Sequence, residues 1–497
     1  MHQLPLIDLV VFVVYMVAVT LFGCSFYFRK GGADAADTFT SGGGRLPAWA
    51  VGMSIFATFV SSISFLGLPA KAYAGNWNAF VFSLSIPLAS VMAIKFFVPL
   101  YRSLGSVSAY SYLETRFGAW ARVYASLCYL LTQVARMGAI MYLLALPLHA
   151  MTGWSVPTLI IVSGVGTLLY CAMGGIQAVI WTDAIQGAVM IVGTFICLGV
   201  LLFAMPGGPA QTWEIATAAD KFSLGSLNLL DWGSETFWVC LVYGIFINLQ
   251  NYGIDQNYIQ RYMTARNERD AVRSTLFGSL LYLPVSFLFF AIGTALFAYY
   301  QARPELLPPE IAAKPDMILP YFIVQGLPKG VTGLLISSIF AAGVSTVSTS
   351  LNSGATILLE DYYKRFIDPA VSGKRALLVL QLGTVLLAAL GVGGALAMMR
   401  VKSALDAWWG LSSVFSGGML GLFLLGYFSR KARNPEAAAG VVLGILTIAW
   451  ICLWQSEPSV IHKNLSIVLG TTVIFLTGFL FSTFFRGKTV TTKGGTA

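Results

Sequence analysis

About thirteen apolar segments, each long enough to cross a bilayer or nearly so, constrain this chain more than any other feature. A helix needs about 20 apolar residues to cross the hydrocarbon core. Only 10% of the residues are charged, against about 25% in a soluble domain. The sequence therefore predicts an all-α integral membrane protein with a single transporter-sized domain over 1–497. The predicted spans are 4–28, 48–72, 77–99, 122–149, 156–178, 184–205, 236–258, 275–300, 328–357, 376–399, 404–427, 437–454 and 466–485.

Lys and Arg are distributed unevenly between the loops that join the predicted spans. With the N-terminus outside and thirteen alternating spans, one set of loops holds 20 of them and the other holds 8. The richer set, which includes Arg122 and Arg261, is expected in the cytoplasm because basic loops stay inside. The C-terminus is then cytoplasmic. The first span is treated as a true helix, since it is too long for a signal-peptide core and follows no basic stretch.

Cysteine and histidine are too scattered to form a disulfide framework, a transition-metal site or a catalytic cluster. The six cysteines lie in predicted spans without paired spacing, and the three histidines stand apart from cysteines and carboxylates. The sequence contains no phosphate-binding Walker loop. The net charge of +9 follows the loops and indicates no nucleic-acid partner. We therefore expect neither an enzyme nor an ATP-driven pump.

Five hydroxyl side chains stand within six residues, at 345–350, of an otherwise apolar segment. A hydroxyl in hydrocarbon costs free energy unless it is hydrogen-bonded, and only one or two can bond back to their own helix. Uncharged oxygens at membrane depth suit a hard, weakly held cation. On a helix one stripe holds Ala342, Ser345, Thr346 and Thr349, with Ser348 beside it.

The second and seventh predicted spans both contain signs of interrupted helices. Residues 54–65 of the second span mix hydroxyl and β-branched side chains between Gly52 and Gly67. Residues 242–262 of the seventh are unusually polar. Broken helices five spans apart are typical of inverted-repeat transporters with a midplane site. The alternatives are a continuous second helix and, for 255–262, an amphipathic end that enters the cytoplasmic loop, so the site interpretation covers only 244–252.

Two of the charged residues in or beside the predicted spans are candidate functional groups. Arg136 stands in the fourth span, where a buried Arg is expensive and usually functional. Its planar fork suits a carboxylate, although a structural tie to backbone carbonyls is the alternative. Asp183 opens the sixth span, where it could cap the helix or complete a cation site.

These stretches together resemble the sodium:solute symporter family and, within it, the bacterial sialic acid symporters. The resemblance covers most of the chain and implies an LeuT-like fold of two inverted five-helix repeats. The repeats would be 48–205 and 236–427, with one helix before them and two after. The stretches that carry the resemblance are 42–45, 65–73, 174–183, 260–262 and 339–353.

The resemblance also implies two sites for Na⁺ as the coupling ion. The first would use the carbonyl oxygens of Ala57, Val60 and Ala342 with the hydroxyls of Ser345 and Thr346. The second would use Asp183, Ser345, Ser348 and Thr349. Asp183 thereby gains a functional role that its local sequence leaves undecided.

The implied substrate site matches the resemblance less closely. Ser61, Ser64 and Arg136 agree in type, whereas Phe59 stands where a Thr is expected and Ser83 where a Gln is expected. Aromatic residues are expected where Ala79 and Gly244 stand. The carboxylate anchor is kept and the sugar-facing wall is rebuilt. The candidate substrate-binding residues are Phe59, Ser61, Ser64, Ser83, Arg136, Gly244 and Asn248.

The resemblance implies a sodium symporter of the bacterial inner membrane that works by alternating access. A sialic acid is the leading substrate, and another sugar, sugar acid or small organic anion is the alternative. A channel is the competing class, but its repeated pore loop or charged ring is missing from the sequence. The expected partners are a small carboxylated substrate and the lipid bilayer, and we expect the chain to work as a monomer.

Overall fold

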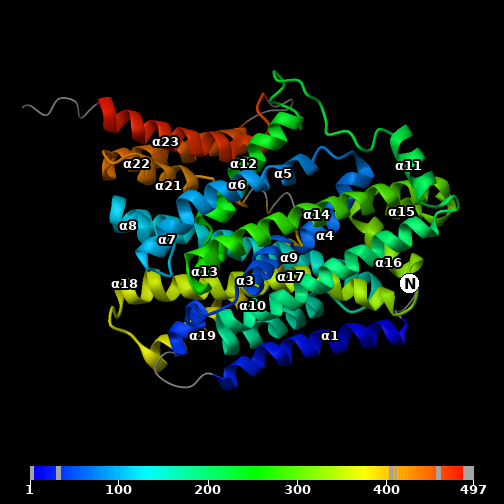
Figure 1. The fold of residues 1–497 in the computed structure, drawn as a ribbon, viewed down its shortest axis with the longest axis horizontal. Coiled ribbons are helices and arrows are strands. Elements are labelled where there is room, and N and C mark those ends of the chain that lie inside the picture. The colour runs from blue at the N-terminus through cyan, green and yellow to red at the C-terminus, as the bar shows by residue number, and fades with distance from the viewer. Residues whose placement is uncertain are drawn as a thin grey trace, which may run out of the picture.

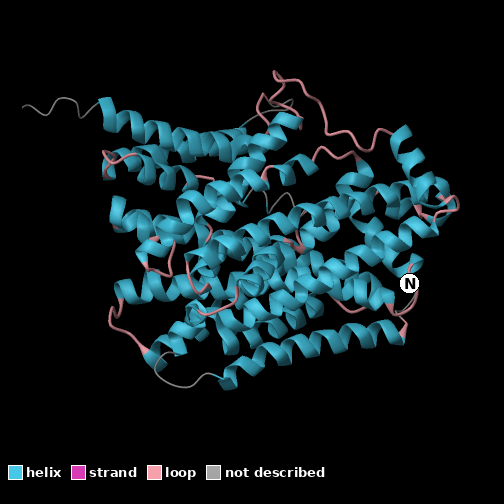
Figure 2. Ribbon diagram, in the orientation of Figure 1, coloured by secondary structure: helices cyan, strands magenta, loops and turns pink. Residues whose placement is uncertain are grey.

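A computed structural model describes residues 5–29, 35–401, 408, 411–412, 415, 417–454 and 460–484 of the chain. In this part of the chain the elements of secondary structure are helices joined by loops, and Figure 2 draws no strand in it. The helices are α1 Leu6–Ser25, α2 Ala35–Ser41, α3 Ala48–Phe59, α4 Ser62–Ala74, α5 Phe80–Leu84, α6 Ile86–Met92, α7 Val98–Leu104, α8 Ser111–Phe117, α9 Ala119–Thr152, α10 Val156–Ala204, α11 Gly208–Ala218, α12 Phe237–Ile254, α13 Gln256–Thr264, α14 Glu268–Ala302, α15 Pro309–Ala312, α16 Ile318–Gly326, α17 Val331–Ile357, α18 Lys364–Phe366, α19 Gly373–Met398, α21 Met419–Phe428, α22 Asn434–Ala449 and α23 Ser466–Phe484.

Ten of the described helices, some of them runs of consecutive helical segments, are long and apolar enough to cross a membrane, and α3 with α4 forms one further, bent span. The longest is α10, whose 49 residues would extend about 74 Å at 1.5 Å per residue. That is more than twice the hydrocarbon thickness of about 30 Å. It bends at Gly175, where φ is 59° and ψ is −155°, a backbone that favours glycine. Of the predicted eleventh span, 404–427, residues 404–407, 409–410, 413–414 and 416 lie outside the described residues, and α21 forms its second half.

Helix α17 lies in the middle of the molecule, and Figure 1 shows α3, α9 and α10 around it. Its polar run is buried, and all five hydroxyl residues of 345–350 are 0% exposed. Close packing brings the neighbours together at glycines. A Cβ on Gly193 of α10 would come within 2.2 Å of Ser338 Oγ on α17. A Cβ on Gly278 of α14 would come within 2.4 Å of the Gly52 carbonyl oxygen on α3.

The predicted interruption of the second span is confirmed. Helix α3 ends at Phe59, α4 begins at Ser62, and the two are bent by 56°. Val60 and Ser61 between them have extended backbone, with ψ of 108° and 170°. The Ser61 hydroxyl then accepts the Ser64 N–H at 3.3 Å, so the residue that leaves one helix caps the next.

The seventh span is also interrupted, but the expectation for its second half is wrong. Helix α12 ends at Ile254, Asp255 has an extended backbone with ψ of 125°, and α13 follows. Residues 255–262 do not enter a loop as an amphipathic end. Arg261, expected in a cytoplasmic loop, is 0% exposed. The polar side chains of α13 can be buried because other buried polar groups supply their hydrogen bonds.

Candidate functional site

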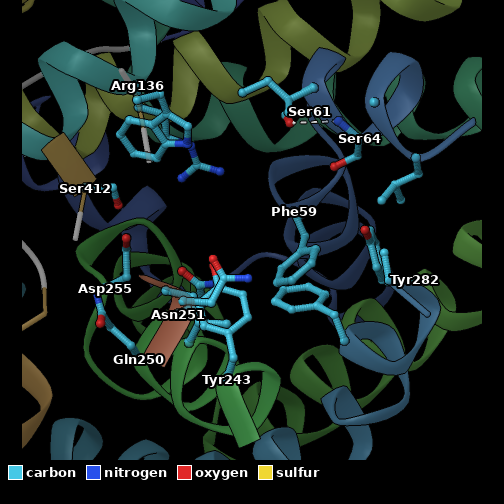
Figure 3. A pocket seen from close by; sticks show the side chains of 18 of the residues that line it. Phe59, Ser61, Ser64, Arg136, Tyr243, Gln250, Asn251, Asp255, Tyr282 and Ser412 are labelled. Carbon is cyan, nitrogen blue, oxygen red and sulfur yellow. Dashed lines mark hydrogen bonds between the residues drawn. The ribbon is translucent and has the colours of Figure 1, made fainter. Parts of the chain in front are cut away.

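A cavity of about 290 Å³ lies between the two broken helices. Its walls come from the start of α4, from α9, from α12 with the break at Asp255, and from Tyr282 on α14 (Figure 3). Trp408 and Ser412 close one side. The volume is at the low end of the range of about 300–1,000 Å³ for small-molecule sites. The cavity can therefore hold one small ligand at the depth where both helices are interrupted.

Arg136 brings a positive charge into the lining of this cavity. It lies on α9, and Figure 3 shows its guanidinium reaching into the open space. Its recorded hydrogen bond is long, from Nη2 to the Thr58 carbonyl oxygen at 3.5 Å. The guanidinium also interacts with the Tyr258 side chain, but it carries five N–H donors, so donors remain available for a ligand. The side chain can accept a carboxylate in the bidentate geometry that Arg favours.

Phe59 forms an aromatic wall on the side of the first break. Its ring stacks on Tyr252 with centroids 5.5 Å apart and planes 4° apart. Tyr282 meets it edge-on at 4.5 Å. These contacts hold the ring in place, and Phe59 is 9% exposed. A hydroxyl at this position would donate to a ligand, whereas this ring offers only a flat apolar face.

The structure brings four of the predicted substrate residues together and leaves three outside the lining. Phe59, Ser61, Ser64 and Arg136 line the cavity, as does Ala79. Ser83 is buried behind the wall, with its hydroxyl 2.7 Å from that of Ser286.

Gly244 and Asn248 belong to the packing between α12 and the α5–α6 segment. A Cβ on Gly244 would lie 2.6 Å from Ser85 Oγ. Asn248 Nδ2 donates to the same hydroxyl at 3.0 Å. Both positions therefore reach a ligand only through their neighbours, because the helix face that carries them is turned toward another helix.

Several lining residues were missed by sequence reasoning. Asp255 and Tyr258 line the cavity, but they lie outside 244–252, the part of the seventh span that the sequence predicts for the site. Gln133 lies three residues before Arg136, almost one helical turn away, so the helical period could have found it. Gln250 and Asn251 also line the cavity. They fall within 244–252, where the polar composition is the signal that indicates them.

Four of the five oxygens predicted for the first sodium site form two hydrogen-bonded pairs. Ser345 Oγ on α17 donates to the Ala57 carbonyl oxygen of α3 at 2.8 Å. Thr346 Oγ1 donates to the Ala342 carbonyl oxygen at 3.1 Å. Val60 follows the C-terminal end of α3, where carbonyl oxygens carry the negative end of the helix dipole. This donor set is neutral, oxygen-only and buried, and it fits a hard monovalent cation.

The residues predicted for the second sodium site lie around a buried ion pair. Asp183 Oδ2 accepts the Arg261 guanidinium at 2.8 Å and the Ser54 hydroxyl at 2.6 Å. The same guanidinium nitrogen donates to Thr349 Oγ1 at 2.7 Å. Both charged side chains are 0% exposed. Arg261 thus bridges two of the four predicted ligands, and sequence reasoning missed it because it was assigned to a loop.

The hydroxyls of the two serines of this set already donate hydrogen bonds, one to α3 and one within α17. Ser345 bonds to Ala57 as described above, and the Ser348 hydroxyl donates to the Ser345 carbonyl oxygen at 2.9 Å. Asp183 Oδ1 is buried and has no hydrogen-bond partner among the described residues. A buried carboxylate oxygen without a partner is costly, so a cation beside Oδ1 fits this arrangement. The described part of the chain contains no group of three or more His, Cys, Asp or Glu side chains that could hold a metal ion.

Most of the chain is similar to proteins of one transporter family. The Sodium:solute symporter family model matches residues 39–444. The sodium/sialic acid symporter NanT of Aliivibrio fischeri is 33% identical over 480 residues, covering 95% of this chain and 92% of that protein. The sodium/sialic acid symporter SiaT of Proteus mirabilis is 34% identical over 451 residues, covering 90% of each.

A solved structure extends the likeness to three dimensions. It is described as the substrate-bound outward-open state of a Na⁺-coupled sialic acid symporter with a novel Na⁺ site. The TM-score is 0.90 at 32% identity, over 96% of this chain and 98% of that one.

Proposed function

The chain belongs to the sodium:solute symporter family, and from this premise we propose that it imports a sialic acid together with Na⁺ by alternating access. The observation that carries the proposal is the position of Arg136. Its guanidinium, which keeps N–H donors for a ligand, faces a small cavity that adjoins the break between α3 and α4. A sugar acid bound there would be held by its carboxylate and would lie beside the helix interruption that offers oxygens to sodium.

The first sodium ion would couple to the substrate through the break at Val60 and Ser61. Ser345 already bonds the α3 end to α17, and sodium would replace this hydrogen bond with shared coordination. The break would then be held in one geometry, and Ser61 and Ser64, which line the cavity, would be positioned for the sugar. Such coupling is typically worth about 1–3 kcal/mol and acts equally in both directions.

We place the second sodium ion beside Asp183 Oδ1, with Ser345, Ser348 and Thr349 as the remaining ligands. The unpartnered carboxylate oxygen supports this position. Arg261 would stay on Oδ2 and share the carboxylate. Two sodium ions with one anion would carry one net positive charge inward, and the membrane potential would contribute about 2.3 kcal/mol per 100 mV.

For the architecture we propose thirteen spans in one domain, with the repeats at 48–205 and 236–427. The bend in α10 and the two interrupted spans support this division. The charge distribution supports an N-terminus outside and a cytoplasmic C-terminus. We further propose that the chain is a multi-pass protein of the bacterial inner membrane and works as a monomer.

A different sugar acid or small organic anion is the second candidate substrate. The observation that favours it is the Phe59 wall, which presents an aromatic ring and no hydroxyl. The serine at position 83 is also withdrawn behind the lining.

Uptake into proteoliposomes tests the function. We expect saturable uptake of labelled N-acetylneuraminate under an inward sodium gradient and none when potassium replaces sodium. Arg136→Ala should reduce uptake at subsaturating substrate by about 100-fold, because two charge-assisted hydrogen bonds are lost. Arg136→Lys, which keeps the charge without the fork, should retain part of the activity. Near-normal uptake by the alanine variant would remove Arg136 as the anchor.

A further inference from the structure

The wall of the cavity near Arg136 carries acceptors that the carboxylate of a substrate cannot use. Four charged side chains line the cavity. Lys71 and Glu235 lie 3.6 Å apart and so neutralise each other. Arg136 and Asp255 remain, and among the described residues neither of them has an ion-pair partner within 4.0 Å. The cavity therefore contains one cation and one anion that make no direct ion pair and attract each other at longer range.

Asp255 has a structural task that uses only one of its oxygens. Its Oδ1 accepts the Asn257 N–H at 2.8 Å and so caps α13. The Asn257 side chain also interacts with this carboxylate, and the residue is half-buried at the cavity surface. A carboxylate can accept about four hydrogen bonds, so capping leaves most of its capacity free.

Gln250 strengthens the same pattern. It also lines the cavity and is 5% exposed, and its Oε1 is buried without a hydrogen-bond partner in the described structure. Figure 3 shows Asp255 and Asn251 around the space into which Arg136 reaches. Buried acceptors without partners cost free energy, so this side of the cavity favours a ligand that carries hydrogen-bond donors.

We propose that Asp255 determines the substrate class: it selects carboxylates that carry hydroxyl or N–H donors and disfavours bare carboxylates. This inference rests on the proposed function and deepens it. The carboxylate of the substrate pairs with Arg136, while its donors satisfy Asp255 Oδ2 and Gln250 Oε1. A bare anion leaves both acceptors unpaired and brings its own charge near that of Asp255.

Three six-carbon acids test which hydrogen-bond donors of a substrate the cavity recognises. Hexanoate has none, gluconate has hydroxyls, and 6-aminohexanoate has an ammonium group. Each is added as a competitor of sodium-driven N-acetylneuraminate uptake, and its binding is also read directly by the sodium-dependent thermal shift of the purified full chain. We expect gluconate or 6-aminohexanoate to bind at least about tenfold more tightly than hexanoate, which corresponds to about 1.4 kcal/mol.

Asp255→Asn keeps the size of the side chain and the oxygen that caps α13. It should raise the half-saturation concentration of N-acetylneuraminate about tenfold and remove the preference over hexanoate, while hexanoate binds equally well or better. Asp220→Asn is the matched control, because Asp220 is an exposed carboxylate outside the cavity. It should leave the preference unchanged.

An equal loss for all three acids in Asp255→Asn would overturn the proposal, because Asp255 would then act only through α13. A wild-type protein without any preference over hexanoate would overturn it as well. If the wild type binds no N-acetylneuraminate but its preference for gluconate depends on Asp255, the inference stands and the proposed substrate fails.

Discussion

The two interrupted spans are built from different chemistry. Between α3 and α4 the break consists of Val60 and Ser61, and its partners are hydroxyls and carbonyl oxygens such as those of Ser345 and Ala57. Between α12 and α13 the break is Asp255, and Arg261 follows less than two turns later. The first break therefore offers neutral oxygens, whereas the second carries charges.

This difference separates the tasks that the two breaks can perform. Neutral oxygens bind a hard cation weakly enough to release it, and release is required of a coupling ion. Charged groups at membrane depth are expensive unless paired, and they impose strong directional preferences. We infer that the first break exchanges sodium, while the second recognises the substrate and ties α13 to α10. Three experiments test this division, in decreasing order of expected effect.

Arg261→Gln should cause the largest change. It removes the partner of Asp183 at 2.8 Å in a fully buried pair, and breaking such a pair typically costs about 3–5 kcal/mol because the remaining charge is uncompensated. We expect a large fall in the free energy of unfolding, measured by denaturation of the purified protein in detergent.

The double variant Arg261→Gln with Asp183→Asn separates charge from packing. It should recover most of the lost stability, because no unpaired charge remains. Sodium binding at the second site should stay impaired, since its carboxylate is gone. If Arg261→Gln alone unfolds like the wild type, the second break does not depend on charge, and the contrast between the breaks fails.

Ser345→Ala should produce an intermediate change confined to the first break. Its hydroxyl joins α17 to the Ala57 carbonyl oxygen at 2.8 Å and belongs to both proposed sodium sites. Losing one ligand should raise the sodium concentration for half-maximal uptake by about tenfold, or about 1.4 kcal/mol. Uptake measured against sodium concentration at fixed substrate gives this value directly.

Ser337→Ala is the matched control on the same helix. Ser337 is equally buried, but its hydroxyl bonds back to the Gly333 carbonyl oxygen at 2.8 Å. Its sodium dependence should match that of the wild type. An unchanged sodium dependence in Ser345→Ala as well would remove Ser345 from both sites.

The sequence predicted the first break better than the second for a physical reason. Hydroxyls at 345–350 stand out against apolar neighbours, and residues 54–65 combine weak helix formers in mid-span. Both signals are local, so periodicity and propensity sufficed. The pairing of Ser345 with Ala57 is non-local, and it came from the family resemblance rather than from the residues.

The second break was misread because polar residues near the end of a span look alike whether water or protein surrounds them. Arg261 in a loop and Arg261 beside Asp183 have the same local sequence, and only tertiary packing distinguishes them. The same ambiguity excluded Asp255 from the candidate site. Gly244 and Asn248, which the sequence places in the substrate site, lie on a helical face that packs against α5 and α6, and a sequence alone does not show which face of a helix meets a neighbouring helix.

The smallest effect is expected at the outer ends of the two spans. Lys71 on α4 lies 3.6 Å from Glu235, which immediately precedes the cap of α12, and the side chains are 46% and 40% exposed. Exposed pairs of this kind contribute about 0.2–1 kcal/mol and are screened by salt. A double-mutant cycle of Lys71→Gln and Glu235→Gln on the half-saturation concentration isolates the pair.

We expect a coupling within that range, which disappears when choline chloride raises the ionic strength at constant sodium. This outcome would mean that the outer halves of the broken spans move independently, and that the buried contact of Arg261 with Asp183 links the second break to the rest of the bundle. A coupling of several kcal/mol that survives salt would reverse the assignment. The outer pair would then join the two spans across the mouth of the cavity, and the charges of the second break would no longer be its distinguishing feature.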